Sequence, residues 1–261
     1  MNRLPSQSPT QNEYLRPYVA ELIRLAGALL EHDNELNAVI CLRIIFELHK
    51  NYRPMLQNEV QPFLDYVQKI YRELPGTMTK LLGVPGTMTK LQSPASGGSL
   101  VPGQLLSSTE SFKVFTECPL IVTLLFQLYP RLASLTLTLT LTRNPNHNPD
   151  WRFLSPNMQQ LTPLMVKALS LQPPQGSQSR QKEHYADFMA AQVKTLYYIT
   201  YHLGQFTDIM QPYRDSITVS VIQLLMNCPN ESVGMRRELL VATRHILQTD
   251  FRVGFFSKVC V

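Results

Sequence analysis

A proline placed directly before a large apolar residue, at the head of an amphipathic run, recurs along this chain. It occurs at Pro17, Pro62, Pro163 and Pro212, which leaves intervals of 45, 101 and 49 residues. Proline is tolerated in the first turn of a helix, where the N–H that it lacks would have no partner. A period of about 40–47 residues with two helices per unit is typical of HEAT and armadillo arrays. The 101-residue interval then holds two units lengthened by insertions.

The first and last of these units share an outline, which strengthens the repeat interpretation. In each, a helix closes on two leucines, an Asn-Glu turn follows, and a second helix ends on an aromatic residue before arginine. The matching pairs are Leu29-Leu30 with Leu224-Leu225, Asn34-Glu35 with Asn230-Glu231, and Tyr52-Arg53 with Phe251-Arg252. The pattern predicts an all-α fold, a HEAT-type α-solenoid of stacked antiparallel helix pairs, with long disordered inserts.

Residues 34–52 form a helical pattern that is apolar on nearly every side. Only Arg43, Glu47 and Lys50 make a narrow polar stripe, and their spacing allows Arg43 to pair with Glu47 at i, i+4. A helix of this kind needs neighbours on several sides to cover it. We therefore expect it to be an inner helix of a larger array.

Composition shifts divide the chain into repeat regions and inserts. The segment after Leu74 repeats the sequence PGTMTKL and is rich in Gly, Pro, Ser and Thr, which is typical of a surface insert. Either a regulated Ser/Thr loop or a plain local duplication explains it. A Leu-Thr alternation at 134–143 has the period of a strand but no partner strand, so we assign it to an irregular insert.

The predicted divisions are a disordered N-terminus (1–13), HEAT repeats (14–74), a flexible insert (75–110), HEAT repeats (111–256) with low-complexity or linker loops at 133–155 and 172–181, and a truncated end (257–261). Within the second repeat region we expect a helix to start at Pro119.

The charge and cysteine content narrow the possible partners. The chain has 261 residues and a net charge of +5, without a run of Lys or Arg that would suggest direct nucleic-acid binding. Its four cysteines, Cys41, Cys118, Cys228 and Cys260, are scattered, which is typical of reduced buried thiols in an intracellular protein. The N-terminus has no apolar signal segment, and no apolar run is long enough to span a bilayer. We expect no membrane partner.

Motifs for catalysis are missing from the sequence. The six histidines are far apart, and there is no HExxH, Walker loop, GxGxxG or GxSxG pattern. The sequence therefore predicts no catalytic residue, no cofactor, no metal site, no small-molecule substrate and no enzyme activity. One enzyme alternative stays open, a site built from the Tyr197–His202 region, and it requires a concave pocket with convergent polar groups.

An arginine-rich segment near residue 240 is a candidate for partner contact. Arg236, Arg237, Arg244 and Arg252 together form a possible basic surface for phosphate or an acidic peptide. The alternative is a solvated outer face with Glu238 nearby. Met235, Leu239, Ala242 and Ile246 are expected on the opposite, inner side of this helix.

Two long stretches resemble one known family. NELNAVICLRIIFELHKNYRP (34–54) and MRRELLVATRHILQTDFRVGFF (235–256) are similar to the amino-terminal HEAT region of the TRRAP family, the pseudokinase scaffolds related to phosphatidylinositol-3-kinase-like kinases. The resemblance implies a nuclear subunit of SAGA- and NuA4-type histone acetyltransferase complexes that contacts transcriptional activators. It implies no catalytic residue here, because the family's kinase-like domain lies far downstream and is itself inactive.

The PGTMTKL duplication and the Leu-Thr tract depart from the family pattern. The chain also stops at Val261, where the family continues into further repeats, so we expect a fragment or a truncated gene model. The resulting hypothesis is a non-catalytic scaffold with acetyltransferase complex subunits and activators as protein partners. Arg237 and Arg244 are its candidate contact residues. A HEAT-repeat binding module of another kind, such as a transport receptor or another kinase-related solenoid, is the alternative.

Overall fold

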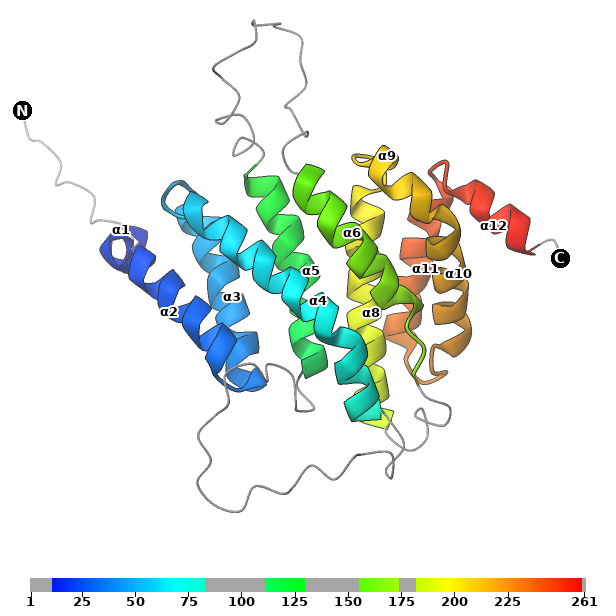
Figure 1. The fold of residues 1–261 in the computed structure, drawn as a ribbon, viewed down its shortest axis with the longest axis horizontal. Helices are drawn as coiled ribbons and strands as arrows, with labels where there is room; N and C mark the ends of the chain where they lie inside the picture. Colours follow the sequence, from blue (N-terminus) through cyan, green and yellow to red (C-terminus); the bar gives the residue numbers. More distant parts are fainter. Residues whose placement is uncertain (1–10, 83–110, 130–154, 174–181, 260–261) are drawn as a thin grey trace, which may run out of the picture.

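The computed structural model describes residues 11–82, 111–129, 155–173 and 182–259, and these residues are almost entirely helical (Figure 1). No β-strand occurs within those ranges. The helices are α1 (Gln11–Leu15), α2 (Val19–His32), α3 (Glu35–Tyr52), α4 (Val60–Leu82), α5 (Ser111–Leu128), α6 (Ser155–Ser170), α8 (Lys182–His202), α9 (Thr207–Met210), α10 (Arg214–Asn227), α11 (Val233–Leu247) and α12 (Arg252–Val259). Short 3₁₀ turns lie at Arg16–Tyr18, Arg53–Met55, Gln57–Glu59 and Gln211–Tyr213.

The helices stack in two layers, which confirms the predicted all-α solenoid. In one layer α3 packs on α5, α5 on α8 and α8 on α11, and in the other α4 packs on α6, α6 on α10 and α10 on α12. Successive helices also pair across the layers, as α2 does with α3, α4 with α5, α6 with α8, and α10 with α11. Each pair thus contacts mainly the pairs beside it, as expected for stacked repeats (Figure 1).

The prolines open some helices and lie inside others. Pro17 and Pro212 belong to 3₁₀ turns that lead into α2 and α10, and Pro62 lies in the first turn of α4. Pro163 and Pro119 instead lie inside α6 and α5, so the expected helix start at Pro119 is wrong. Pro119 and its neighbour Cys118 are buried, as are Thr162 and Met165 close to Pro163, and this packing outweighs the lost backbone hydrogen bond.

The predicted insert begins later than expected, because α4 continues through Pro75 to Leu82. Thr77 and Met78 are buried and extend the apolar side of the helix past Leu74. The hydroxyl of Thr79 donates to the carbonyl of Pro75, with an O···O distance of 2.9 Å. The prediction of a flexible insert is therefore wrong for residues 75–82, and residues 83–110 lie outside the described part of the chain.

Other predicted boundaries differ by a few residues. α1 begins at Gln11 and leads into the turn before α2, so 11–13 are helical despite their polar composition. α6 begins at Ser155, and α12 continues to Val259. Most of the predicted loop at 133–155, including the Leu-Thr tract, lies outside the described residues. So do residues 1–10, residues 174–181 of the predicted linker, and residues 260–261.

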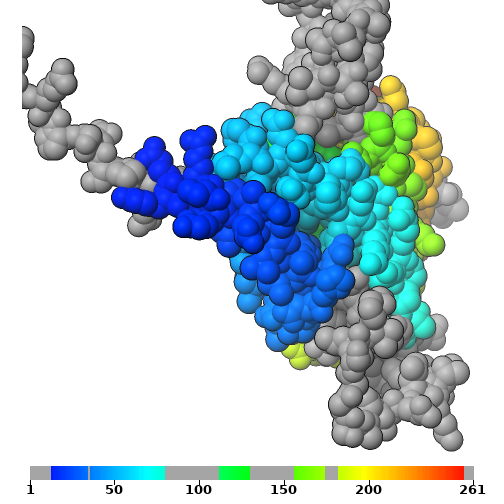
Figure 2. All heavy atoms as spheres, turned by 60° about the vertical axis from the view of Figure 1, so that its left-hand side comes forward, coloured from blue at the N-terminus to red at the C-terminus, as the bar shows by residue number. Residues whose placement is uncertain are grey.

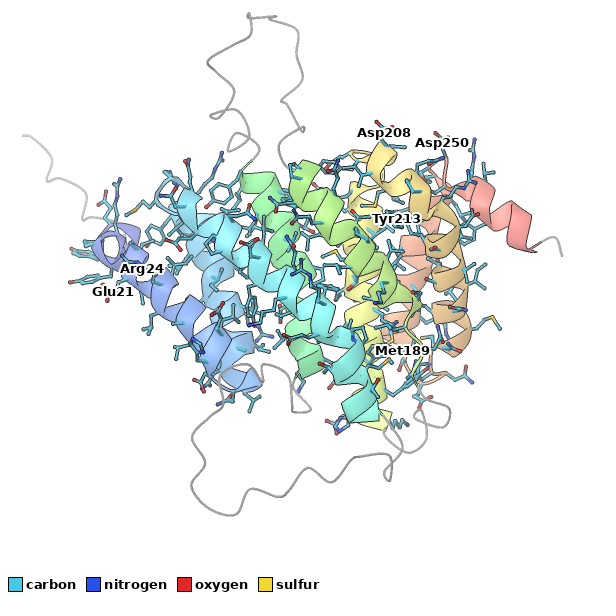
Figure 3. The ribbon with its side chains drawn as sticks, viewed as in Figure 1. Glu21, Arg24, Met189, Asp208, Tyr213 and Asp250 are labelled. Carbon is cyan, nitrogen blue, oxygen red and sulfur yellow. The ribbon has the colours of Figure 1, made fainter. Side chains whose placement is uncertain are left out.

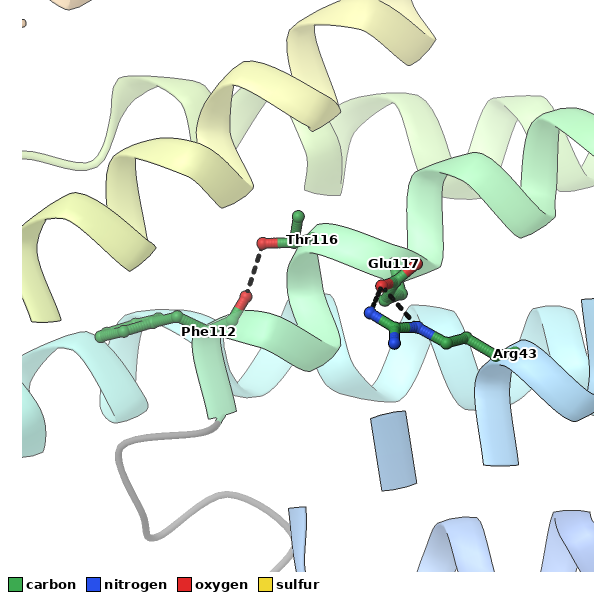
Figure 4. A network of polar contacts seen from close by, with 4 residues as sticks. All are labelled: Arg43, Phe112, Thr116 and Glu117. Atoms are coloured by element: carbon green, nitrogen blue, oxygen red, sulfur yellow. Dashed lines mark hydrogen bonds and ion pairs between the residues drawn. The ribbon is translucent and has the colours of Figure 1, made fainter. Parts of the chain in front are cut away.

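An ion pair joins α3 to α5 in place of the expected pair within α3 (Figure 4). Nη2 of Arg43 lies 2.8 Å from Oε1 of Glu117, and its Nε donates to the same oxygen. Glu47 pairs with Lys50 instead, at 3.7 Å. Because an i, i+4 pair contributes only a few tenths of a kcal/mol, a carboxylate on a packed neighbouring helix readily replaces it. α2 and α5 both cover α3, as expected for an inner helix, but Leu36, Ile40 and Ile44 remain exposed.

The densest packing lies between α5 and α8. The rings of Phe112 and Phe188 meet edge to face with centroids 5.3 Å apart, and both side chains are fully buried. Gln192 on α8 donates to the carbonyls of Ala168, Leu169 and Leu171 at the end of α6. One buried amide thus satisfies carbonyls that a helix end leaves without partners.

Candidate partner-contact surface

Helix α11 has one buried face and one exposed face. Leu239, Ala242 and Ile246 are buried, as the sequence pattern predicts, and Met235 is half-buried. The opposite face carries alternating apolar and basic residues spaced by four and three positions, so that they fall on one side of the helix. We call this row the α11 stripe; it consists of Val233, Arg237, Leu240, Arg244 and Leu247, all exposed.

A shallow groove follows the α11 stripe. Its volume is about 370 Å³, and the residues that line it are Val233, Arg236, Arg237, Leu240, Val241 and Arg244. Val233 is 73% exposed and Leu240 is 55% exposed, which is unusual for large aliphatic side chains in a folded protein. Apolar contact area and two cationic groups are therefore available at the same place.

Within the described residues, neither Arg237 nor Arg244 makes an ion pair. The carboxylate of Glu238, which the alternative interpretation placed beside them, binds Nζ of Lys194 on α8 at 2.9 Å. Arg236 donates to the carbonyls of Cys228 and Pro229 and to Oδ1 of Asn230, and so stabilises the turn before α11. Because Arg236 is used in this way, the predicted surface of four arginines is smaller than expected.

This arrangement suits an acidic partner segment that also carries apolar side chains. Arginine is weakly hydrated and presents several donors that match a carboxylate. An amphipathic helix binds a groove through apolar residues on one of its faces. The α11 stripe offers such a helix Val233, Leu240 and Leu247, with an arginine between each two. The sequence anticipated the positions of Arg237 and Arg244, and the structure adds the aliphatic residues between them.

The Tyr197–His202 region does not form the concave polar site that the enzyme alternative requires. The Tyr198 hydroxyl donates to Sδ of Met158, and the buried His202 ring packs against Phe126, Tyr198 and Phe206. Burial lowers the pKa of His202 to about 4.

Other chemical features of the described residues are few. Cys41, Cys118 and Cys228 are buried free thiols, whereas Cys260 lies outside the described part. In that same part, no three His, Cys, Asp or Glu side chains gather closely enough to hold a metal ion. None of its helices combines the length and apolar character that crossing a membrane requires.

His49 is among the buried polar residues that sequence reasoning missed. It lies on the apolar side of α3 in register with Cys41 and Ile45, is fully buried, and contacts the hydroxyl of Tyr129 through Nδ1 at 2.7 Å. Within the described residues, its Nε2 has no hydrogen-bond partner. The sequence signal that could have identified it was a histidine on the apolar face of a helical pattern, since a buried polar group needs a hydrogen-bond partner.

The sequence is similar to one family along nearly its whole length. Residues 184–261 match the family model described as the Tra1 HEAT repeat central region. The resemblance noted above pointed instead to the amino-terminal HEAT region. No solved structure is significantly similar to the chain.

Full-length relatives match far more of the chain. A probable transcription-associated protein 1 of Dictyostelium discoideum is 35% identical over 98% of it, and the human transformation/transcription domain-associated protein is 33% identical over 98%. The SAGA complex/NuA4 acetyltransferase complex subunit Tra1 of Schizosaccharomyces pombe is 31% identical over 88%. The chain spans only about 6–7% of the length of these relatives.

Proposed function

The chain belongs to the Tra1/TRRAP family, and from this premise we propose that it is a non-catalytic scaffold segment of a SAGA/NuA4-type histone acetyltransferase coactivator complex in the nucleus. The observation that carries the proposal is the similarity over 88–95% of the chain to the fission and budding yeast proteins named as subunits of those complexes. The two-layered helical array supports it, because such arrays present extended surfaces to partner proteins.

The scaffold acts through exposed helix faces. Each helix pair contacts mainly the pairs beside it, so much of its outer surface is left for other proteins. The partners are other subunits of the acetyltransferase complex and transcriptional activators. Activator segments rich in acidic and apolar residues lie along the α11 stripe, with Arg237 and Arg244 binding their carboxylates.

Affinity purification of the tagged chain from nuclear extract tests the assignment to a complex. Recovery of acetyltransferase complex subunits is expected. Recovery of Ran or transport cargo in their place would support the alternative of a transport receptor. Recovery of subunits of another kinase-related assembly would support a different solenoid of that superfamily.

A pair of charge reversals tests the contact residues. Arg237→Glu with Arg244→Glu is expected to weaken activator binding about tenfold or more. Folding should stay intact, since both side chains are exposed and without ion pairs in the described residues. The matched control is Arg16→Glu with Lys69→Glu, which changes the net charge equally at exposed sites on other elements. Equal binding by the two double variants would mean that net charge alone matters.

A further inference from the structure

A cavity of about 300 Å³ lies between α2 and α4. These two helices run side by side in one layer, with α3 behind them (Figures 1 and 2). α2 packs extensively on α3 but makes few direct contacts with α4. Gly27 and Ala28 line the cavity on the α2 side, and a Cβ added to Gly27 would meet no atom within 4 Å. Small residues on α2 therefore leave the space between the two helices only partly filled.

The cavity opens to solvent and has apolar walls. Ala28 on α2 and Pro62 on α4 are exposed at its mouth. Phe63 and Tyr66 of α4 lie deeper, and each remains 5% exposed. The other buried apolar residues of the wall are Ile23, Leu30 and Ile45. A volume of this size is at the lower end of the range for small-ligand pockets, so it suits a single aromatic ring.

Carboxylates outnumber cations at the mouth of the cavity. The charged side chains there are those of Arg24, Glu31 and Glu59, and the exposed His32 also lines it. Figure 3 labels Arg24 on α2 together with Glu21, which does not line the cavity. Within the described residues, neither Glu31 nor Glu59 makes an ion pair. Two carboxylates are thus available to a cationic ligand.

The cavity has a cationic end and an anionic end along α2. Arg24 and Glu31 are seven positions apart, which is about 10 Å along the helix axis. Nε of Arg24 donates to the carbonyl of Ala20 at 3.1 Å, one turn further from Glu31. The Tyr66 hydroxyl donates to the carbonyl of Leu30 at 3.2 Å, so the Tyr66 ring lies at the Glu31 end. Burial chiefly raises the pKa of this hydroxyl, and the charge of Glu31 is among the groups that raise it further, which places that carboxylate near the ring.

A ring that carries a positive charge matches this end of the cavity. The apolar walls favour burial of the ring. An ammonium group beside an aromatic ring and a carboxylate is attracted to both. An anionic ligand would instead face two negative side chains, and a neutral ligand would leave both of them unpaired.

We propose that this cavity binds an aromatic ring that carries an ammonium group on a short linker, with the ring between α2 and α4 and the ammonium group beside Glu31. Such a group can come from a free arylalkylamine or from the amino terminus of a polypeptide that begins with an aromatic residue. Neither source is part of the scaffold role proposed above.

Gly27 offers a way to close the cavity without disturbing the fold. Gly27→Leu places a side chain into the open space, and it also removes a glycine from a helix interior, which favours the helix. Gly76→Leu is the matched control, since Gly76 lies in α4, has equally open surroundings and does not line the cavity. Circular dichroism checks that both variants are folded.

The test measures binding of three ring compounds to the 261-residue chain by ligand-observed NMR. Phenethylamine carries an ammonium group, 2-phenylethanol a neutral hydroxyl and 3-phenylpropionate a carboxylate, on linkers of similar length. Phenethylamine is expected to bind about fivefold more tightly than the alcohol, and the carboxylate more weakly than either. Added salt should narrow the difference between amine and alcohol, because salt screens exposed charges. Gly27→Leu should abolish binding of the amine, whereas Gly76→Leu should retain it.

Glu31→Gln tests the charge while it keeps the shape of the side chain. The affinity for phenethylamine should fall towards that for 2-phenylethanol, and the affinity for the alcohol should stay unchanged. Glu21→Gln is the matched control, since Glu21 is also exposed on α2 but does not line the cavity. It should change neither affinity.

Phenylalanylglycinamide separates the two sources of the ligand. Its binding shows that the site takes the amino terminus of a polypeptide, and binding of phenethylamine alone restricts the site to free amines. No binding of phenethylamine to the folded chain, equal binding of the amine and the alcohol, or amine binding that survives Gly27→Leu would overturn the proposal. An equal loss of amine binding in Glu31→Gln and Glu21→Gln would overturn it as well.

Discussion

The two outer faces of the described array expose aliphatic side chains in different chemical settings. On the first hairpin, Leu25 and Leu29 of α2 and Leu36 and Ile40 of α3 are exposed. On the α11 stripe, aliphatic residues of similar exposure are separated by Arg237 and Arg244.

Bare aliphatic helix faces are what neighbouring repeats of a solenoid bury against one another. Interleaved arginines add a preference for acidic partners, because electrostatic complementarity selects among apolar surfaces. The first hairpin is therefore suited to stacking, and the α11 stripe to selective recognition.

Among the substitutions, the largest effect is expected from one in the packed middle of the array, which joins the two faces. Phe188→Ala removes a fully buried ring that packs on Phe112 in the middle of the array. The lost burial and the cavity should lower the free energy of unfolding by about 3–5 kcal/mol. Urea denaturation measures this loss, and hydrogen exchange should show that both outer faces lose protection. Loss of protection on one face alone would mean that the faces do not fold as one unit.

Acid should destabilise the chain through its buried histidines. The pKa values of His49 and His202 are lowered from about 6.5 to about 4, because burial disfavours the charged ring. The unfolded chain therefore binds protons first, so stability is full above about pH 6.5 and falls as the pH drops towards 4. Each group contributes on the order of 3 kcal/mol to that loss.

Urea denaturation at pH 7 and at pH 4 measures the acid effect. His49→Phe should remove the part of the acid-induced stability loss that comes from His49 in the first hairpin. The part that comes from His202 in the interior should remain. The same acid loss in this variant and in the unmodified chain would contradict the assignment of a neutral, buried His49.

A smaller effect is expected where α12 packs on α10, close to the α11 stripe. A Cβ at Gly254 would lie 2.5 Å from Oγ1 of the buried Thr218, which is closer than real contacts allow. Gly254→Ala should therefore cost about 1–3 kcal/mol through overpacking. Gly234→Ala in α11, where a Cβ meets nothing within 4 Å, should instead stabilise by about 0.5–1 kcal/mol. Thermal unfolding compares them, and equal shifts in Tm would contradict the close approach.

The smallest effect is expected from charges placed on the first hairpin. Leu36→Lys with Ile40→Lys should change the free energy of unfolding by no more than about 0.5 kcal/mol, because both side chains are exposed. Chemical denaturation measures the change. A loss of several kcal/mol would show that these residues are covered in solution, for example by a second copy of the chain, and dilution would then lower the Tm.

Periodicity predicted the architecture well, because a solenoid is built from local helix pairs whose apolar faces repeat along the sequence. It placed Leu239, Ala242 and Ile246 inside, and Arg237 and Arg244 outside. Periodicity failed where contacts between helices decide how far a helix extends or which ion pair forms. Pro119 and Pro75 are carried within helices by buried neighbours, and Arg43 pairs with Glu117, 74 residues away.

The candidate partner-contact surface was likewise predictable from the sequence only in part. The sequence could identify the arginines of α11, but it could not show that Arg236 binds the preceding turn or that Glu238 binds Lys194. The buried contact between His49 and Tyr129 was also beyond prediction, because the two residues lie 80 positions apart in the sequence.

The most direct test of the account measures binding of a labelled acidic and hydrophobic activation peptide by fluorescence anisotropy. The unmodified chain, Arg237→Glu with Arg244→Glu, and Leu36→Lys with Ile40→Lys are compared at low and high salt. The account predicts that the arginine variant binds about tenfold more weakly or worse, and that its residual binding depends less on salt. The first-hairpin variant should bind at least as well as the unmodified chain. Unchanged binding by the arginine variant, with loss in the first-hairpin variant, would contradict the claim that the α11 stripe is the recognition surface.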